Sequence, residues 1–60
     1  MNLEKVLREY GGKESHVPTV ARVLGLTSAC VYGWKKKGYI PYQSQLLIEL
    51  YSNGKFKASK

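Results

Sequence analysis

The stretch TVARVLGLTSACVYGWKK, residues 19–36, decides the fold of this chain. Apolar side chains recur in it on both sides of Gly25, at the spacing that places side chains on one face of a helix. The side chains in this pattern are Val20, Ala21, Leu24, Leu26, Val31 and Trp34. The stretch therefore predicts two short helices that meet at a tight turn and pack their apolar faces together.

The turn between these helices has the residue types that a crosswise packing needs. Two helices that cross at about 90–120° through a turn of about three or four residues bring their backbones close together. Ala21 provides a small side chain at the crossing, and Gly25 tolerates the positive φ that a sharp turn requires. This pattern is typical of the DNA-binding helix-turn-helix. The alternative is a plain helical hairpin that has no role at DNA.

Sequence signals before and after this stretch extend the helical prediction. Asn2 suits the N-cap of a first helix that ends at the glycine pair of residues 11–12. Pro18 suits the first turn of the second helix, and Thr27 suits the N-cap of a third helix over residues 28–37. The N-terminal part of the chain is therefore expected to fold as three helices.

Residues 41–60 are compatible with two structures. A helix over residues 41–52 is favoured by Pro41 at its first turn and by an apolar stripe. The stripe consists of Leu46, Leu47, Leu50 and Tyr51. A β-hairpin is favoured by Asn53-Gly54, a strong type I′ turn signal. We favour the helix, so the predicted fold is a compact all-α domain of four or five helices with a helix-turn-helix. The alternative is three helices plus a C-terminal β-hairpin around Asn53-Gly54.

Size and charge narrow the functional class. The chain has 60 residues and a formal net charge of +6, which predicts one small basic domain with a polyanionic partner. We expect residues 1–54 to form the folded DNA-binding domain. Residues 55–60 are expected to form a disordered basic tail that tracks the DNA backbone through Lys55, Lys57 and Lys60. A solvated lysine surface is the alternative explanation of the charge.

Several classes of function lack their residues in this sequence. There is no paired-carboxylate site, no nucleophile beside a base and no phosphate-binding loop, so we expect no enzyme activity and no small-molecule substrate. The single histidine, His16, and the single cysteine, Cys30, are too few for a metal site, and no cofactor is expected. No apolar run is long enough to cross a membrane, and an unpaired cysteine fits a reducing compartment. The expected location is the cytoplasm.

The segment LGLTSACVYGWKKKGYIP, residues 24–41, resembles the Cro repressors of temperate bacteriophages. The resemblance is greatest to members whose helix-turn-helix ends in a tryptophan followed by Ile-Pro. Ile48-Glu49 is also similar to the fourth helix of that family, and the resemblance covers most of residues 17–54. It implies a transcriptional repressor that acts in a bacterial host cell and binds operator DNA. Members of the family have either a helical or a β-hairpin C-terminal half, and the Ile-Pro junction favours the helical branch.

The third helix is expected to enter the major groove with its N-terminal end nearest the bases. Its exposed residues are the candidate base contacts, namely Ser28, Ala29, Tyr32, Gly33 and Lys36. The candidate phosphate contacts are Thr19, Arg22, Thr27, Lys35 and Lys37. Gly33 stands where helix-turn-helix proteins often have a long polar side chain. It either permits a close approach to DNA or leaves one base pair unread.

A second copy of the chain is the other expected partner, because one domain of 60 residues has little base-reading surface. A weak homodimer, or a dimer formed on a two-fold operator, is expected to pair through apolar residues of the segment 46–56. The candidate interface residues are Leu46, Ile48, Tyr51 and Phe56. The alternative function is that of an antitoxin-like or prophage regulator whose segment 46–56 binds a protein partner.

Overall fold

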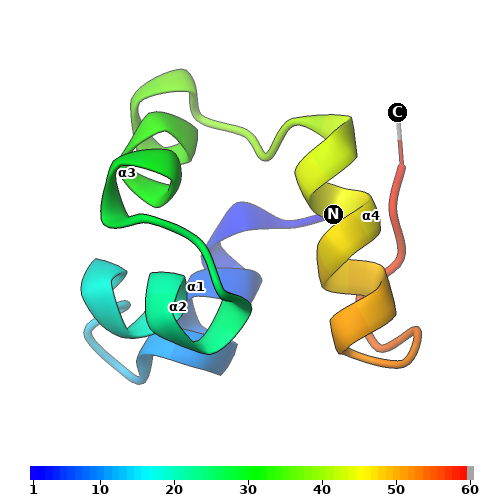
Figure 1. Ribbon diagram of the computed structural model, residues 1–60, viewed down its shortest axis with the longest axis horizontal. Helices are drawn as coiled ribbons and strands as arrows, with labels where there is room; N and C mark the ends of the chain where they lie inside the picture. Colours follow the sequence, from blue (N-terminus) through cyan, green and yellow to red (C-terminus); the bar gives the residue numbers. More distant parts are fainter. Residues whose placement is uncertain (60) are drawn as a thin grey trace.

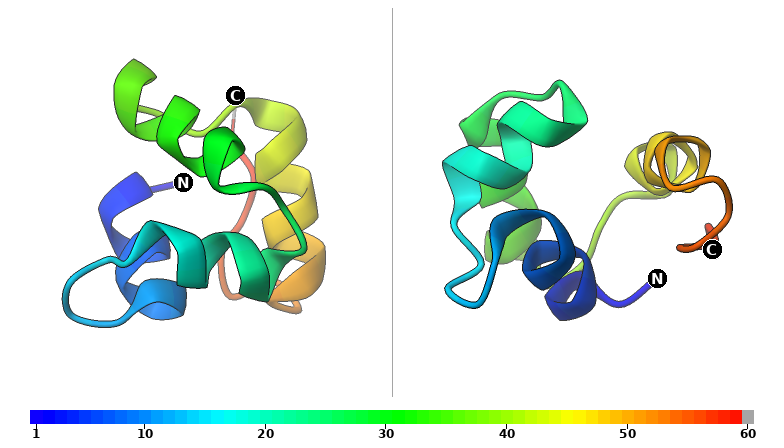
Figure 2. Two further views of the ribbon diagram at one scale, coloured as in Figure 1. Left: turned by 60° about the vertical axis from the view of Figure 1, so that its left-hand side comes forward. Right: turned by 90° about the horizontal axis from the view of Figure 1, so that it is seen from below.

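The computed structural model describes residues 1–59, and all the regular structure in that range is helical (Figure 1). Helix α1 spans Leu3–Gly11, α2 spans Val17–Leu24, α3 spans Ser28–Lys37 and α4 spans Tyr42–Tyr51. The predicted all-α fold is therefore confirmed. The first three helices gather at one end of the molecule, and α4 stands at the other end beyond the connection at residues 38–41 (Figures 1 and 2).

The β-hairpin alternative is wrong, although its turn signal has a physical basis. Asn53 and Gly54 both have positive φ, 55° and 87°, which is what a type I′ hairpin turn needs. Their N–H groups instead donate back to the last turn of α4, where Gly54 N lies 3.0 Å from Glu49 O. The two residues therefore end a helix and turn the chain back toward α1.

The helix ends follow the capping residues in the sequence. The Asn2 side chain accepts a hydrogen bond from Lys5 N at 3.0 Å, and the Thr27 hydroxyl accepts one from Cys30 N at 3.3 Å. Gly25 ends α2 in the left-handed region, with φ 73° and ψ 28°. The next amide, Leu26 N, then donates to Ala21 O at 2.8 Å. These bonds satisfy backbone groups that a helix terminus leaves free, and they fix the short turn between α2 and α3.

The core lies between α1, α2 and α3 and receives one side chain from α4. Its buried apolar residues are Val6, Leu7, Val17, Val20, Ala21, Leu24, Val31, Trp34, Ile40 and Ile48. Trp34 is only 2% exposed, as the packing pattern predicts for the inner face of α3. Its indole Nε1 is buried and has no hydrogen-bond partner among residues 1–59. Leu26 is partly buried against this core.

A buried glutamine holds α4 to the connection that precedes it. Gln45 is 7% exposed, and its Nε2 donates to Ile40 O at 2.7 Å. Its Oε1 accepts from Ser59 N at 2.8 Å. Both ends of the amide are therefore satisfied, as a buried polar side chain requires. The bonds position Ile40 and Ile48 at the core, where they are 1% and 0% exposed.

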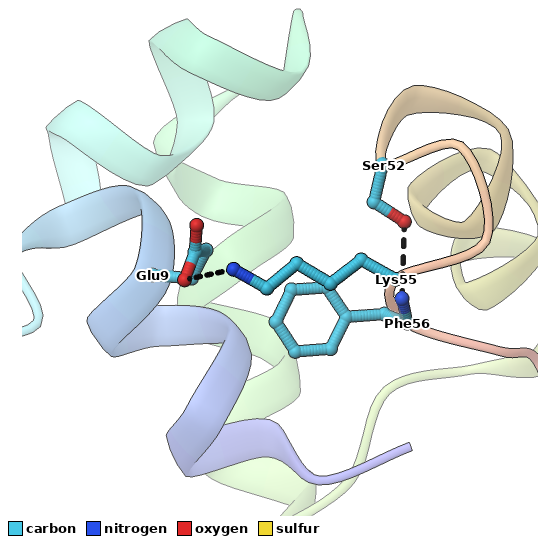
Figure 3. A network of polar contacts seen from close by, with 4 residues as sticks. All are labelled: Glu9, Ser52, Lys55 and Phe56. Atoms are coloured by element: carbon cyan, nitrogen blue, oxygen red, sulfur yellow. Dashed lines mark hydrogen bonds and ion pairs between the residues drawn. The ribbon is translucent and has the colours of Figure 1, made fainter.

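Residues 55–59 fold back onto the domain instead of forming the expected disordered arm. Lys55 Nζ lies 2.8 Å from a carboxylate oxygen of Glu9 on α1, and Phe56 N donates to the Ser52 hydroxyl at 3.1 Å (Figure 3). The Phe56 ring lies 5.9 Å from the Tyr10 ring, centroid to centroid. Burial of this ring offsets the ordering of the segment. Lys60, the last residue of the expected tail, lies outside the described residues.

Candidate nucleic-acid interface

Helix α3 has a buried face and an outer face, the latter defined here by the exposed residues Ala29, Tyr32 and Lys36. Val31 and Trp34 lie in the core against α2, while Ala29, Tyr32 and Lys36 are exposed on the other side. Tyr32 is 54% exposed. Of the five expected base contacts, these three lie openly on the outer face. Ser28 and Gly33 are half-buried at its margins.

The start of α3 offers backbone donors beside small side chains. Ser28 and Ala29 occupy its first turn, where N–H groups have no partner within the helix. The Thr27 hydroxyl oxygen already accepts from Cys30 N, which leaves its own proton free to donate to an acceptor such as a phosphate. No acidic residue lies in this first turn. The end of α3 that is expected nearest to DNA therefore presents hydrogen-bond donors and a positive helix-dipole end.

The last turn of α3 consists of Lys35, Lys36 and Lys37, all of which are exposed. None of them forms an ion pair within the described part of the chain. Residues 15–48 contain these three lysines and Arg22 but no Asp or Glu. The middle of the chain is therefore uniformly positive, and the four carboxylates lie before and after it.

The three lysines point to different sides, as a helical turn requires. Lys35 lines a hollow together with Asn2 and Glu4 at the start of α1. Lys36 follows Tyr32 by four positions and shares the outer face with it. Lys36 is therefore better placed than Lys35 to reach a ligand on the outer face of α3.

Two expected phosphate contacts lie on α2. Arg22 is exposed, and Thr19 is half-buried in the first turn. The Thr19 hydroxyl lies 2.8 Å from His16 Nδ1, a contact that the sequence analysis did not predict. The only signal for it was the three-residue spacing at a helix start. The pair gives the start of α2 an exposed imidazole in addition to the hydroxyl.

Gly33 is not required by the packing of the protein. It lies within α3 and has no positive φ. Apart from its chain neighbours and the backbone of its own helix, an added Cβ would meet no atom within 4 Å. Gly11 differs, because a Cβ there would come 2.7 Å from both His16 N and Val20 Cγ2. Gly11 is therefore a packing glycine, whereas Gly33 faces open space.

The expected dimer residues divide into two groups. Leu46 and Tyr51 are 45% and 54% exposed, as an interface requires. The assignment of Ile48 is wrong, because this side chain is 0% exposed in the core. Phe56 is half-buried and packs against Tyr10 of its own chain.

The apolar stripe predicted for α4 faces outward. Leu47 and Leu50, which belong to this stripe, are 39% and 78% exposed. The buried positions of the helix are instead Gln45 and Ile48. The outer face of α4, defined here as Leu46, Leu47, Leu50 and Tyr51, is therefore an exposed apolar surface.

A polar and aromatic cluster around Tyr10 lies between α1 and the end of α4, away from the outer face of α3. Tyr10 meets Tyr51 edge-on at 5.5 Å between ring centroids, and its phenol is hydrogen-bonded to Ser52. Burial raises the pKa of Tyr10 above its ordinary 10.0, with smaller contributions from Glu9 and Tyr51. Lys55 and the Ser52 hydrogen bond act against this shift. The cluster joins α1 to the end of α4 and has a structural role.

Other kinds of site find no support in residues 1–59. No three His, Cys, Asp or Glu side chains gather there in a way that would hold a metal ion. The free thiol of Cys30 is half-buried on α3. None of the four helices in that range combines the length and apolar character that crossing a bilayer demands.

Comparison with known proteins adds no relative: no family model matches the chain, and neither the curated proteins nor the solved structures contain a significant match.

Proposed function

We propose that this chain is a sequence-specific DNA-binding transcriptional repressor of the phage Cro type. In this proposal α2 and α3 act as a helix-turn-helix, and α3 enters the major groove of operator DNA. The protein acts in the cytoplasm of a bacterial host by covering a promoter. It has no catalytic step.

The observation that carries the proposal is the combination of shape and charge on α3. A helix of 10 residues is anchored by a buried Trp34 and keeps its opposite face open. That open face has small side chains at its start and a lysine at its end, within a stretch of chain that lacks carboxylates. A major groove accepts one α-helix, and lysines neutralise the phosphates on its two sides.

The expected contacts follow from these positions. Ser28 and Ala29 would lie nearest the base edges, where a hydroxyl reads several edges and a methyl group meets a thymine methyl. Tyr32 and Lys36 would lie further along the same face. Thr27, Thr19, Arg22, Lys35 and Lys37 are the proposed phosphate contacts around it.

We further propose that two copies pair on a two-fold operator through the outer face of α4. Leu46 and Tyr51 of the original assignment remain in this surface, and Leu47 and Leu50 join it. Ile48 does not belong to it, because it is buried. Pairing doubles the number of bases that are read, which a single small domain needs for useful specificity.

The test is a binding selection from random duplex DNA at low and at high salt. The proposal predicts a pair of half-sites about one helical turn apart and an affinity that falls steeply with salt. Recovery of no preferred sequence at either salt concentration would contradict sequence-specific repression.

The exposed face of α4 also favours a second candidate, an antitoxin-like or prophage regulator that binds a protein partner through residues 46–56. The variant Leu50→Lys distinguishes the two candidates, because it places a charge at the most exposed residue of this face, which is 78% exposed. A repressor that pairs on DNA loses cooperative binding to a full operator but keeps its half-site preference. A partner-dependent regulator has no such preference in the wild-type chain alone.

A further inference from the structure

The packing of this protein does not explain why residue 33 is a glycine. Glycine is the poorest helix former after proline, and it costs stability in the interior of a helix. Gly33 is the sixth of the ten residues of α3, and it has no positive φ that would require glycine. Apart from its two chain neighbours and the backbone of its own helix, a Cβ at this position would meet no atom within 4 Å. Glycine at this position therefore makes α3 less stable than alanine would, and it brings no packing contact in return.

The position of Gly33 shows where the missing side chain matters. It lies four residues after Ala29 and three before Lys36, so the three residues are neighbours along one edge of the outer face. Ala29 and Gly33 together leave the backbone of α3 nearly bare at the middle of this edge. The bare segment, defined here as Ala29 and Gly33, is flanked by the half-exposed Tyr32 ring and the exposed Lys36 side chain.

The dimensions of helix and groove indicate what the bare segment permits. A helix with its side chains is about 10–12 Å across, while its Cα atoms lie only about 2.3 Å from the axis. The major groove is about 12 Å wide and about 8.5 Å deep. An ordinary side chain on the inward face therefore holds the helix axis away from the base edges. Without one, the axis can lie about 3 Å nearer to the groove floor.

We propose that Gly33 is the position at which the backbone of α3 makes close contact with the duplex, and that it sets the depth of α3 in the major groove. This inference rests on the proposed function. The depth fixed at Gly33 determines whether Ser28 and Ala29, which have short side chains, reach the base edges. Gly33 is a positioning residue: it lowers the stability of α3 and allows the helix axis to lie closer to the floor of the groove.

The test uses Gly33→Ala and Gly33→Gln, each assayed for thermal stability without DNA and for affinity to the duplex that wild type selects. Gly33→Ala is expected to raise the Tm, because the added methyl group has room, and to weaken binding to that duplex at least fivefold. Gly33→Gln is expected to weaken it further, since the loss grows with side-chain size. Adding Ser28→Ala to the Gly33→Ala variant should then reduce the affinity little further, because Ser28 no longer reaches the base edges in that variant.

Three results would overturn the inference. Binding within fivefold of wild type for Gly33→Ala would show that the helix does not need the bare segment. Tighter binding or a new base preference for Gly33→Gln would show that the glycine leaves a base pair unread. A lower Tm for Gly33→Ala would show that the position lacks the room that the structure gives it. If the wild-type chain itself selects no duplex, the proposed function fails as well, and that result is distinct from all three.

Discussion

Gly11 and Val20 are in such close contact that a Cβ on Gly11 would lie 2.7 Å from Val20 Cγ2. The same added atom would lie 2.7 Å from the backbone nitrogen of His16, which cannot rotate away. The end of α1 thus packs against the start of α2 through bare backbone. This contact fixes the pair of helices against which α3 is positioned.

We therefore expect Gly11→Ala to destabilise the domain by about 1–3 kcal/mol, the usual cost of an overpacked site. Gly33→Ala is the matched control, because it makes the same change in open space and should stabilise by about 1 kcal/mol. Urea denaturation of both variants measures the free energy of unfolding. Two changes of the same sign would contradict the packing described for these glycines.

Ser28→Ala tests the reading of bases at the start of α3. If the hydroxyl reads a base edge, the variant should lose about 1–3 kcal/mol on the preferred duplex and should relax the preference at one operator position. Competition binding against duplexes that differ at single positions measures both effects. An equal loss on preferred and random DNA would remove Ser28 from the base contacts.

Lys36→Ala tests whether Lys36, a candidate base contact at the other end of the outer face, contacts a phosphate instead. We expect weaker binding and a salt slope reduced by about one, because one fewer counterion is released. Lys5→Ala is the matched control, since Lys5 lies on α1 beside Phe56 and not on α3. An unchanged slope in Lys36→Ala, or the same reduction in Lys5→Ala, would exclude Lys36 from phosphate binding and leave a base contact or no contact.

The Tyr10 cluster predicts a loss of stability at high pH. Because burial raises the pKa of Tyr10 in the folded chain, its neutral form contributes stability that is fully present below the ordinary value of 10.0. That contribution falls as the pH rises from 10.0 through the higher pKa of the folded state. Above pH 10.0, wild type should therefore lose unfolding free energy relative to Tyr10→Phe, which has no phenol to ionise.

Urea titrations at a series of pH values provide this measurement, with Tyr39→Phe as a control that removes a phenol at a 59% exposed position. A constant difference between wild type and Tyr10→Phe across the range would contradict the burial of the Tyr10 phenol.

Local sequence signals predicted the helices well because local interactions determine their ends. Asn2, Thr27 and Gly25 act through hydrogen bonds or a φ value within a few residues. Pro41 likewise marks the start of α4: it occupies the N-cap, and the helix begins at Tyr42, one position after the expected start. These features depend on no distant part of the chain, so one sequence contains enough information to place them.

The orientation of α4 could not be predicted from periodicity. Five of the six residues 46–51 are apolar, so apolar side chains surround this part of the helix and several faces are equally acceptable as the buried one. The buried face is the one that holds Gln45 and Ile48. The Gln45 side chain bonds Ile40 O, five residues before it, and Ser59 N, 14 residues after it. Ile48 lies on this buried face at 0% exposure, whereas Leu50 faces outward at 78%. The order in residues 55–59 depends on contacts with Glu9 and Tyr10, which lie at the other end of the sequence.

The buried and exposed faces of α3 were predicted better than the packing of α4. The burial of Val31 and Trp34 fixes the opposite face of α3, so the exposure of Tyr32 and Lys36 followed from their spacing alone. The contact between His16 and Thr19, by contrast, depends on side-chain rotamers at a helix start. The open space around Gly33 depends on the tertiary arrangement, which residue spacing does not give.

The most direct measurement is an amide NMR titration of the 15N-labelled chain with the duplex recovered by selection, combined with intermolecular NOEs. If α3 enters the major groove, the largest shift changes should lie in residues 28–36, with NOEs from the Ala29 methyl group and the Gly33 Cα protons to base protons. Shift changes confined to α4 and residues 52–59, with α3 unaffected, would contradict the placement of α3 at DNA.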